Sequence, residues 1–438
     1  MSPVSGRVTR HLPLTFVMIL AAVLLLAAAC DDGEPDITTS ITSAGSDAPR
    51  SRANPGAGEQ AAAATRAFAA DLYRELAATE DGNLVFSPHS IAIALAMTRA
   101  GAEGETASQM DAVLHASRAG DLHAGFNALE QALAGRSGEY PIGGGDETAE
   151  LELSIVNQLW GQEGFEFVDD FLDLLAAEYG ADMRLVDFVQ AYEEARVLIN
   201  EWVAERTRER IDELIPEGVI DDMTRLVLTN AIYLNAPWVH RFDEDATAPA
   251  AFTLLDGNEV EVDMMRLDER IEYGEGDGFQ AVRLPYVDGS LSMIAVLPDD
   301  FAVFEAGLDG DRVDEIVASL GDARVELGFP RFEFRTEALL KDALSNLGMP
   351  IAFEPDEADF SGIAPPDDLH IQDVVHEGFI SVDEHGTEAA AATAVVVGVV
   401  SAPPINVEVD FDRPFLFFVH DRDSGAILFM GRVLNPVS

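Results

Sequence analysis

The chain has a single cysteine and a single lysine among its 438 residues. Cys30 has no partner within the chain, so no internal disulfide supports the fold. Lys and Arg together number 27 against 79 Asp and Glu, which gives a formal net charge of −52. A chain this acidic repels nucleic acid, heparin-like polymers and anionic lipid surfaces, and we expect none of these as a partner. The composition also suggests the hypothesis of a salt-adapted protein, which a melting curve in rising salt tests.

Catalytic signatures are also missing. The sequence contains no G-x-S-x-G, no H-E-x-x-H and no P-loop. The glycine-rich run at 274–278 does not join a strand to a helix, which favours a hairpin turn over a phosphate cradle. Asp309, Asp311 and Asp314 lack the rest of a calcium-binding loop, and they predict the solvated start of a helix instead. We therefore predict that the protein is not an enzyme, and we expect no metal and no other cofactor.

The N-terminus has the form of an export signal. Arg7 and Arg10 precede an apolar run over residues 14–26, and small residues then lead to Cys30. The position of Cys30 after three alanines resembles the lipobox of bacterial lipoproteins. That resemblance implies a signal peptide over residues 1–29 and a lipid on Cys30. It predicts an exported protein that touches a bacterial membrane only through this anchor, facing the periplasm or the exterior. An uncleaved membrane anchor is the alternative, although the apolar run is short for a membrane span.

Residues 30–60 consist mostly of Asp, Gly, Ser, Thr, Pro and Ala without a periodic apolar pattern, which predicts a flexible tether. No repeat or second linker interrupts residues 61–438, so we predict one domain of mixed α+β class. Ser87 and Pro88 predict the capped start of a helix. Further helices are expected over 171–179 and 195–206, and strands over 83–86, 226–234, 281–284, 291–297, 325–329 and 332–334, with a last hairpin over 415–433.

The most unusual stretch runs from Glu384 to Ser401 and contains small and β-branched residues with no basic or aromatic side chain. Read with the period of a strand, one face carries Thr387 and then only small, uncharged residues, and the other carries Glu388. The first face can enter a packed interior while Glu388 faces water. On these residues alone, a low-complexity linker and a segment that becomes a buried strand both remain open.

Motifs from residue 61 to the C-terminus resemble the signatures of the serpins, and they occur in the order of that family. They are Asn83–Ile91, Asn200–Val203, Asn230–Tyr233, Leu284–Tyr286, Pro330–Phe332, Val375–Phe379, Arg413–Phe415 and Phe429–Val433. A small departure is Leu234-Asn235-Ala236, where the family usually has Phe-Lys-Gly. The resemblance implies the serpin fold over residues 61–438, with three β-sheets, a helical layer and an exposed reactive-centre loop.

The resemblance also implies a monomeric, single-use inhibitor of serine proteases. The protease cuts the loop and is trapped as an acyl-enzyme when the loop inserts into the large sheet. Loop insertion in serpins is a known case of a strand being added to a sheet. Family spacing from Glu384 places the scissile bond at Val400-Ser401, with Val399-Val400 as the alternative. A small β-branched residue before the cut predicts an elastase-like partner protease. A non-inhibitory serpin acting as a protease substrate, carrier or chaperone is the alternative function, and a hydrolytic lipoprotein comes after it.

Further residues take their expected roles from the resemblance. A loop hinge that matches the inhibitory consensus consists of Glu384, Gly386, Thr387, Glu388, Ala389, Ala390, Ala391, Ala392 and Thr393. A polar cluster that controls opening of the sheet consists of Ser87, Ser90, Asn230 and His376, although each can equally be a satisfied polar group of the core. Arg331 and Glu384 are expected to form a salt bridge at the top of the sheet.

Overall fold

The protein is described by a computed structural model that covers residues 40–142, 147–364, 369–388 and 406–438. The predicted signal over 1–29, Cys30, the hinge residues Ala389–Thr393 and the bond Val400-Ser401 lie outside these ranges. Within them, no helix is both long enough and apolar enough to cross a membrane. The description below concerns the unit Thr38–Ser438.

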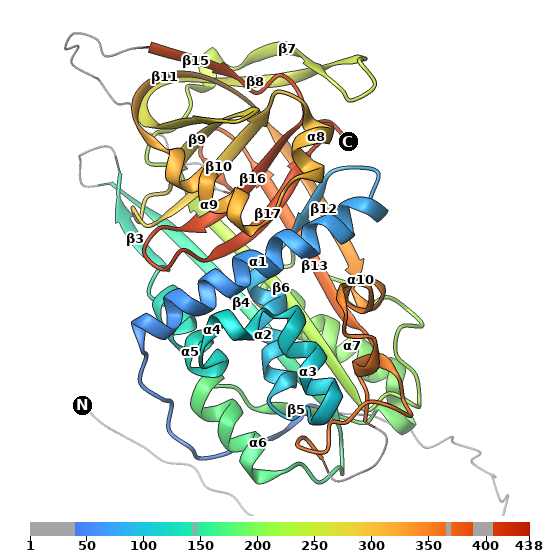
Figure 1. Cartoon of the computed structure of the whole chain (residues 1–438). Helices are drawn as coiled ribbons and strands as arrows, with labels where there is room; N and C mark the ends of the chain where they lie inside the picture. Colours follow the sequence, from blue (N-terminus) through green and yellow to red (C-terminus); the bar gives the residue numbers. More distant parts are fainter. Residues whose placement is uncertain (1–39, 143–146, 365–368, 389–405) are drawn as a thin grey trace, which may run out of the picture. The chain divides into compact units, whose positions relative to one another are not determined.

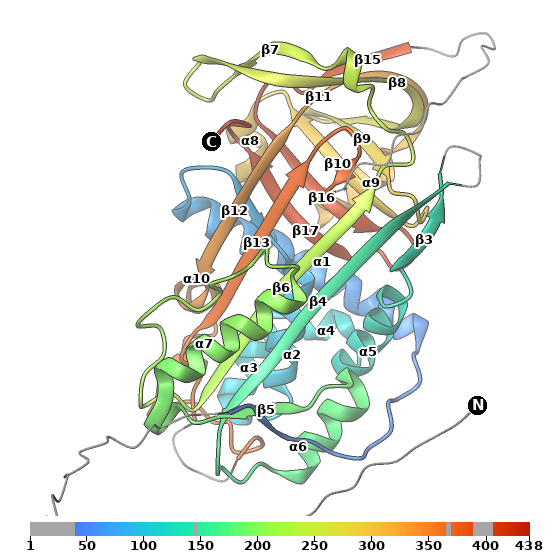
Figure 2. The same cartoon turned by 180° about the vertical axis from the view of Figure 1, so that it is seen from behind.

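Eight strands form a large sheet, seen face-on in Figure 2. Their order is β1 (Thr42–Ala44), β5 (Met183–Val186), β4 (Thr148–Gln162), β6 (Leu226–Pro237), β14 (Gly386–Thr387), β13 (Val374–Val382) and β12 (Phe332–Leu339), with β3 (Gly138–Pro141) paired to β4. β6 is buried along almost its whole length because side chains cover both of its faces. A strand that is covered on both faces needs apolar residues at successive positions, and this explains the near-continuous apolar run from which a buried strand was predicted over 226–234.

Nine strands form a second hydrogen-bonded sheet. They are β15 (Asn406–Asp410), β11 (Gly321–Pro330), β8 (Glu259–Gly276), β9 (Phe279–Pro285), β10 (Leu291–Pro298), β16 (Phe415–Asp421), β17 (Ile427–Val433) and β2 (Leu84–Phe86), with β7 (Ala248–Thr253) paired to β8. β15 and β7 lie at one end, in contact with the long strands β8 and β11, which continue toward the other strands (Figure 1). The second and third expected sheets are therefore joined into one hydrogen-bonded sheet, because β8 pairs with both β11 and β9. The turn between β8 and β9 confirms the hairpin predicted at 274–278.

Helices cover both faces of the large sheet. α7 (Phe188–Arg206) crosses the face turned toward the viewer in Figure 2, and α2 (Pro88–Arg99) packs on the opposite face. The other helices are α1 (Pro55–Thr79), α3 (Gly104–Val113), α4 (Ala116–Ala119), α5 (Leu122–Leu133), α6 (Asp169–Leu174) with the π-turn η1 (Leu175–Tyr179), α8 (Phe301–Ala306), α9 (Gly310–Ser319) and α10 (Lys341–Leu347); short 3₁₀ turns are η2 (Glu244–Ala246) and η3 (Pro350–Phe353). Ser87 caps α2 as predicted, and Asp309 caps α9.

The structure differs from the tether expected over residues 30–60. Thr42 pairs with Leu185 across β1 and β5, the amide of Ser51 donates to the carbonyl of Ala177 at 2.7 Å, and α1 already begins at Pro55. A Cβ added to Gly125 of α5 would lie 2.6 Å from the Cβ of Ala61 in α1. The small residues around position 60 therefore allow α1 and α5 to pack closely. Their composition is also typical of a flexible linker, so the sequence alone does not reveal the helix.

Candidate functional site

The site lies where β6 and β13 separate. These strands pair directly and in parallel from Val374 with Leu228 to Glu377 with Ala231. At the far end of β13, the two-residue strand β14 stands between them: Gly386 and Thr387 pair with β6, and Thr387 also pairs with Val382 of β13. The first residues of the predicted hinge thus already lie in the large sheet at one end of the gap between β6 and β13. At the other end of the gap, these two strands pair directly with each other.

Thr387 is the residue by which the uncharged face of the hinge enters the interior. It is 3% exposed, and its Oγ1 lies 2.6 Å from the hydroxyl of Tyr286. Tyr286 in turn stacks on Trp238, with ring centroids 4.6 Å apart. Gly386 has no room for a side chain, because an added Cβ would lie 2.3 Å from the carbonyl oxygen of Ala236. Contacts with neighbouring strands therefore restrict which side chains fit at positions 386 and 387.

Glu388 ends the described part of the hinge. Its backbone has a positive φ of 53°, and its amide donates to the carbonyl of Ser381 at 2.8 Å. Its carboxylate accepts a hydrogen bond from Arg210, which follows α7. The structure differs from the expectation that Glu388 can face water, because its side chain is only 9% exposed. Burial raises the pKa of this carboxyl, although the ion pair with Arg210 opposes the shift.

The predicted salt bridge at the end of β13 is present. Nε of Arg331 lies 2.7 Å from Oε2 of Glu384, and the hydroxyl of Thr247 donates to the other carboxylate oxygen. The Glu384 side chain is only 2% exposed. Burial alone would raise the pKa of Glu384, but the bonds from Thr247 and Arg331 outweigh it and hold the pKa below its ordinary value. The charged form of Glu384 thus anchors the base of the hinge.

The four residues of the predicted polar cluster meet under the large sheet. Nε2 of His376 accepts the backbone N–H of Ser87 at 3.0 Å, so its proton lies on Nδ1, which donates to Oδ1 of Asn230 at 2.6 Å. Nδ2 of Asn230 donates to Oγ of Ser90 at 2.8 Å. All four are buried. Burial lowers the pKa of His376 to about 3, which keeps its imidazole neutral.

Asn157 of β4 completes this cluster and was missed in the sequence. Its Oδ1 accepts from Nδ2 of Asn230 at 2.7 Å and from the hydroxyl of Ser90 at 2.6 Å. Asn157 faces Asn230 across the β4–β6 pairing. The only sequence signal is a polar residue within an apolar stretch, and it does not reveal the register that brings the two asparagines together. The contacts of Thr247, Tyr286 and Arg210 with the hinge were also missed, because they join segments far apart in the sequence and no local pattern encodes them.

The cluster can act as a lock on the sheet. The bond from His376 to Asn230 joins β13 to β6, and these are the two strands that must separate if a further strand enters between them. The bonds to Ser87 and Ser90 tie both strands to the start of α2. Nothing in this arrangement resembles a nucleophile with its base, and no group of His, Cys, Asp and Glu suited to a metal occurs among the residues that the structure describes.

The family model described as Serpin (serine protease inhibitor) matches residues 63–436. The chain belongs to the serpin family. An uncharacterized serpin-like protein of Thermococcus kodakarensis is 39% identical over 85% of each chain, and the human leukocyte elastase inhibitor is 35% identical over 86% of this chain and all of that one. The native state of tengpin, a thermophilic serpin, has a TM-score of 0.77 at 27% identity and covers 91% of this serpin and 100% of its own chain. The predicted serpin fold is confirmed.

Proposed function

We propose that this serpin is a single-use inhibitor of serine proteases. The observation that carries the proposal is β14: Gly386 and Thr387 already lie between β6 and β13. β14 is antiparallel to both strands and runs from Pro237 toward Ala236 of β6, which is the direction that the chain after it would have to follow to enter the gap. Continued pairing along β6 would make that chain a full strand of the large sheet. The leukocyte elastase inhibitors among the relatives support the same class of activity.

The proposed reaction begins as an ordinary proteolysis. The hydroxyl oxygen of the protease serine attacks the carbonyl carbon of Val400, and the bond to Ser401 breaks. The amine of Ser401 leaves with the proton that the protease base supplies, and an ester joins Val400 to the protease. The loop, now free at one end, enters the sheet before water hydrolyses the ester. The seventeen residues from Glu384 to Val400 extend to roughly 55 Å, which carries the attached protease along the sheet and distorts it.

We infer an elastase-like target from Val400. A small β-branched side chain suits a small apolar specificity pocket, whereas a trypsin-like pocket is acidic and selects a basic residue. Cleavage at Val399-Val400 is the alternative, and the C-terminal peptide that each cut releases differs by one valine.

Incubation with pancreatic elastase tests the proposal. An inhibitor forms a complex that survives boiling in SDS, because an ester joins the two chains. Quantitative cleavage without such a complex would contradict the proposal and favour the non-inhibitory alternative, in which the loop is only a substrate. The same serpin already cut at Val400-Ser401 serves as the control, since the bond that the protease attacks is then gone.

A further inference from the structure

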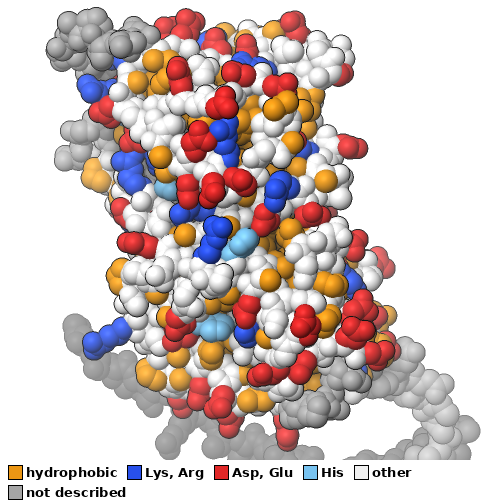
Figure 3. Space-filling view, in the orientation of Figure 1, with side chains coloured by type: hydrophobic (Ala, Val, Ile, Leu, Met, Phe, Trp, Pro, Cys, Tyr) orange, Lys and Arg blue, Asp and Glu red, His pale blue; other side chains and the backbone are white. Residues whose placement is uncertain are grey.

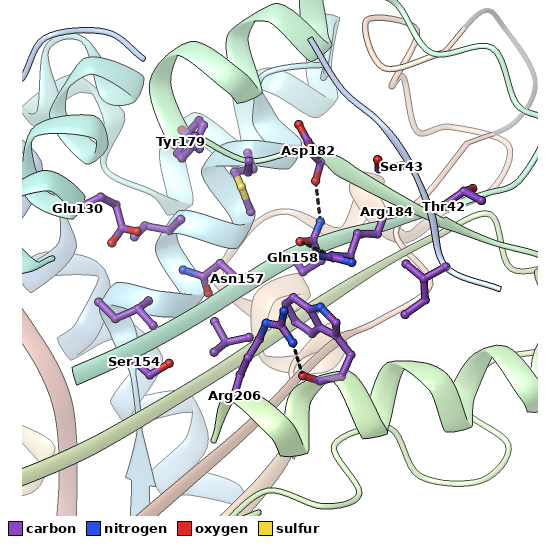
Figure 4. Close-up of a pocket in the computed structure, with 18 residues that line it drawn as sticks. Thr42, Ser43, Glu130, Ser154, Asn157, Gln158, Tyr179, Asp182, Arg184 and Arg206 are labelled. Carbon is purple, nitrogen blue, oxygen red and sulfur yellow. Dashed lines mark hydrogen bonds between the residues drawn. The ribbon is translucent and has the colours of Figure 1, made fainter. Parts of the chain in front are cut away.

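A cavity of about 570 Å³ lies between β1, β4, β5 and α7 (Figure 4). Its volume falls in the range of small-molecule sites. None of the residues that line it belongs to the hinge, and the proposed inhibition makes no use of it apart from one shared residue, Asn157.

Two guanidinium groups flank one aromatic ring in this cavity. Cζ of Arg206 lies 4.0 Å from the ring centroid of Trp202, and Cζ of Arg184 lies 5.0 Å from it. Nε of Arg184 donates to the amide oxygen of Gln158 at 3.3 Å. Arg206 donates to the backbone carbonyl of Trp202 at 3.0 Å, and its ion-pair partner in the described part of the chain is the exposed Glu205 at 3.7 Å. Among the described residues, neither arginine has the bidentate carboxylate partner that a guanidinium prefers. Burial, and then the charge of Arg184, lower the pKa of Arg206.

Further donors line the same cavity. Nε1 of Trp202 and Nδ2 of Asn157 are shielded from solvent and have no hydrogen-bond partner among the described residues. Buried donors of this kind cost free energy until an acceptor reaches them. The cavity thus offers several N–H groups and few free acceptors close to Arg206.

The remaining lining defines the rest of the ligand. Ile93 and Met97 of α2 contribute an apolar wall. The acids Glu130 and Asp182 lie well apart from Arg206 in Figure 4, and Glu130 already bonds to His89 at 3.2 Å. Asp182 lies on the side of Arg184 and Gln158, where its backbone carbonyl accepts a hydrogen bond from Nε2 of Gln158 at 2.7 Å, so Arg206 is the guanidinium farther from both acids.

We propose that this cavity binds a small amphipathic carboxylate, with the carboxylate held by Arg184 and Arg206 and the apolar body against Ile93 and Met97. An anion placed there relieves the repulsion between the two guanidinium groups and accepts the unused N–H groups. A guanidinium pair beside an aromatic face suits a flat carboxylate better than a spherical anion.

The ligand reaches the sheet lock through Asn157. This side chain holds Ser90 and Asn230 through Oδ1, while its Nδ2 is free to donate to the ligand. A ligand that fixes Asn157 favours the closed arrangement of β4, β6 and α2, so it opposes separation of the sheet by its differential affinity for that state. This consequence rests on the proposed inhibitory function, whereas the binding site does not.

Calorimetric titration of the full chain with sodium octanoate tests the site, in enough NaCl to screen the net charge. We expect saturable binding at one site, with affinity at least roughly tenfold lower in Arg184→Gln and Arg206→Gln, since each removes a charge-assisted hydrogen bond. The exposed Arg118→Gln is the matched control and should bind as the wild type does. Octanamide and acetate should both bind more weakly than octanoate. Equal binding of octanamide, or unchanged affinity in both cavity variants, would overturn the proposal.

The rate of complex formation with pancreatic elastase tests the coupling. Octanoate at a concentration that just saturates the wild type should slow it in the wild type and in Arg118→Gln, and should slow it less in Arg184→Gln, whose site is then only partly occupied. Octanoate that binds but does not change the rate would refute the coupling through Asn157. A wild-type protein that forms no complex at all refutes the inhibitory function, and the titration then still decides the binding site.

Discussion

At the residue scale, the site depends on buried side chains whose charge is set by their surroundings. His376 is neutral because its imidazole is surrounded by the sheet and α2, and Glu384 stays charged because Arg331 and Thr247 hold its oxygens. Thr387 is buried without charge, as the resemblance to inhibitory serpins required. Charged side chains at the base of the hinge and at position 388 are therefore each paired with an arginine. We expect a charge at Thr387, which lies between them, to be unfavourable.

If the proposed inhibition is right, Thr387→Arg should turn this serpin from an inhibitor into a substrate. A guanidinium in place of the Thr387 hydroxyl would have to be buried against the ring of Tyr286, and burying a charge without a bonded partner costs several kcal/mol. Elastase should still cut the loop, while the SDS-resistant complex disappears from the gel. Thr387→Val keeps the shape without the charge and is expected to retain complex formation. Stable complexes formed by Thr387→Arg would show that entry of Thr387 is not required.

Glu377 predicts a pH dependence of stability. It lies on β13 next to His376, only 2% exposed, and burial raises its pKa to about 7 despite Arg335 at 3.3 Å. A carboxyl whose folded pKa lies above the unfolded value stabilises the fold when protonated, so its contribution is complete below about pH 4.5 and is lost as the pH rises through 7.

Glu377→Gln removes that titration. Between pH 5 and 8, the free energy of unfolding should fall less steeply with pH in Glu377→Gln than in the wild type, as measured by urea titration. His376 acts in the opposite direction below pH 6.5, since its pKa is lowered, and is common to both proteins. The exposed Glu326→Gln is the matched control and should follow the wild type. Parallel curves for wild type and Glu377→Gln would contradict the account.

At the scale of elements, β14 is the decisive piece of structure. A strand of two residues contributes little pairing energy of its own, so its place depends on the fit between Gly386 and β6 and on the anchor at Glu384. The cluster around Asn230 closes the same two strands further along. The sheet is thus held by β14 at one end and by direct pairing at the other.

Gly386→Ala should expel β14. The added methyl group would overlap the backbone of Ala236 and Pro237, which cannot move without disturbing β6. Hydrogen exchange at the amides of Thr387 and Glu388 should become faster, and complex formation with elastase slower. Gly82→Ala, where an added Cβ meets no atom within 4 Å, is the control and should change neither. Unchanged exchange in Gly386→Ala would mean that β14 tolerates a side chain.

Sequence and structure agree best where the evidence is local or carried by motifs. The cap at Ser87, the turn after Gly276 and the meeting of Ser87, Ser90, Asn230 and His376 were all predicted, and the structure brings these groups together; the role of the cluster in opening the sheet stays a prediction. Asn157 and Arg210 depend on strand register and on the path of the chain after α7, and no local pattern encodes either.

At the scale of the whole molecule, negative charge dominates. Acidic side chains are spread over the face shown in Figure 3, with arginines among them. Ion pairs between exposed side chains, such as Arg270 with Asp322 and Arg324 with Asp268, each contribute little to stability. The excess of acids therefore repels itself within the folded state.

The melting temperature should rise as NaCl increases from low to molar concentration, because screening weakens this repulsion. KCl should act alike, since any monovalent salt screens equally at the same ionic strength. Differential scanning calorimetry provides the measurement. A melting temperature that is flat or falls over this range would contradict the hypothesis of a salt-adapted protein.

The intact mass of the complex with pancreatic elastase tests the central claim most directly. The account predicts a single covalent species whose mass equals that of the protease plus this chain ending at Val400, less one water for the ester, and a released peptide that begins at Ser401. A mixture of free protease and two cleaved fragments, with no covalent species at any time point, would contradict it.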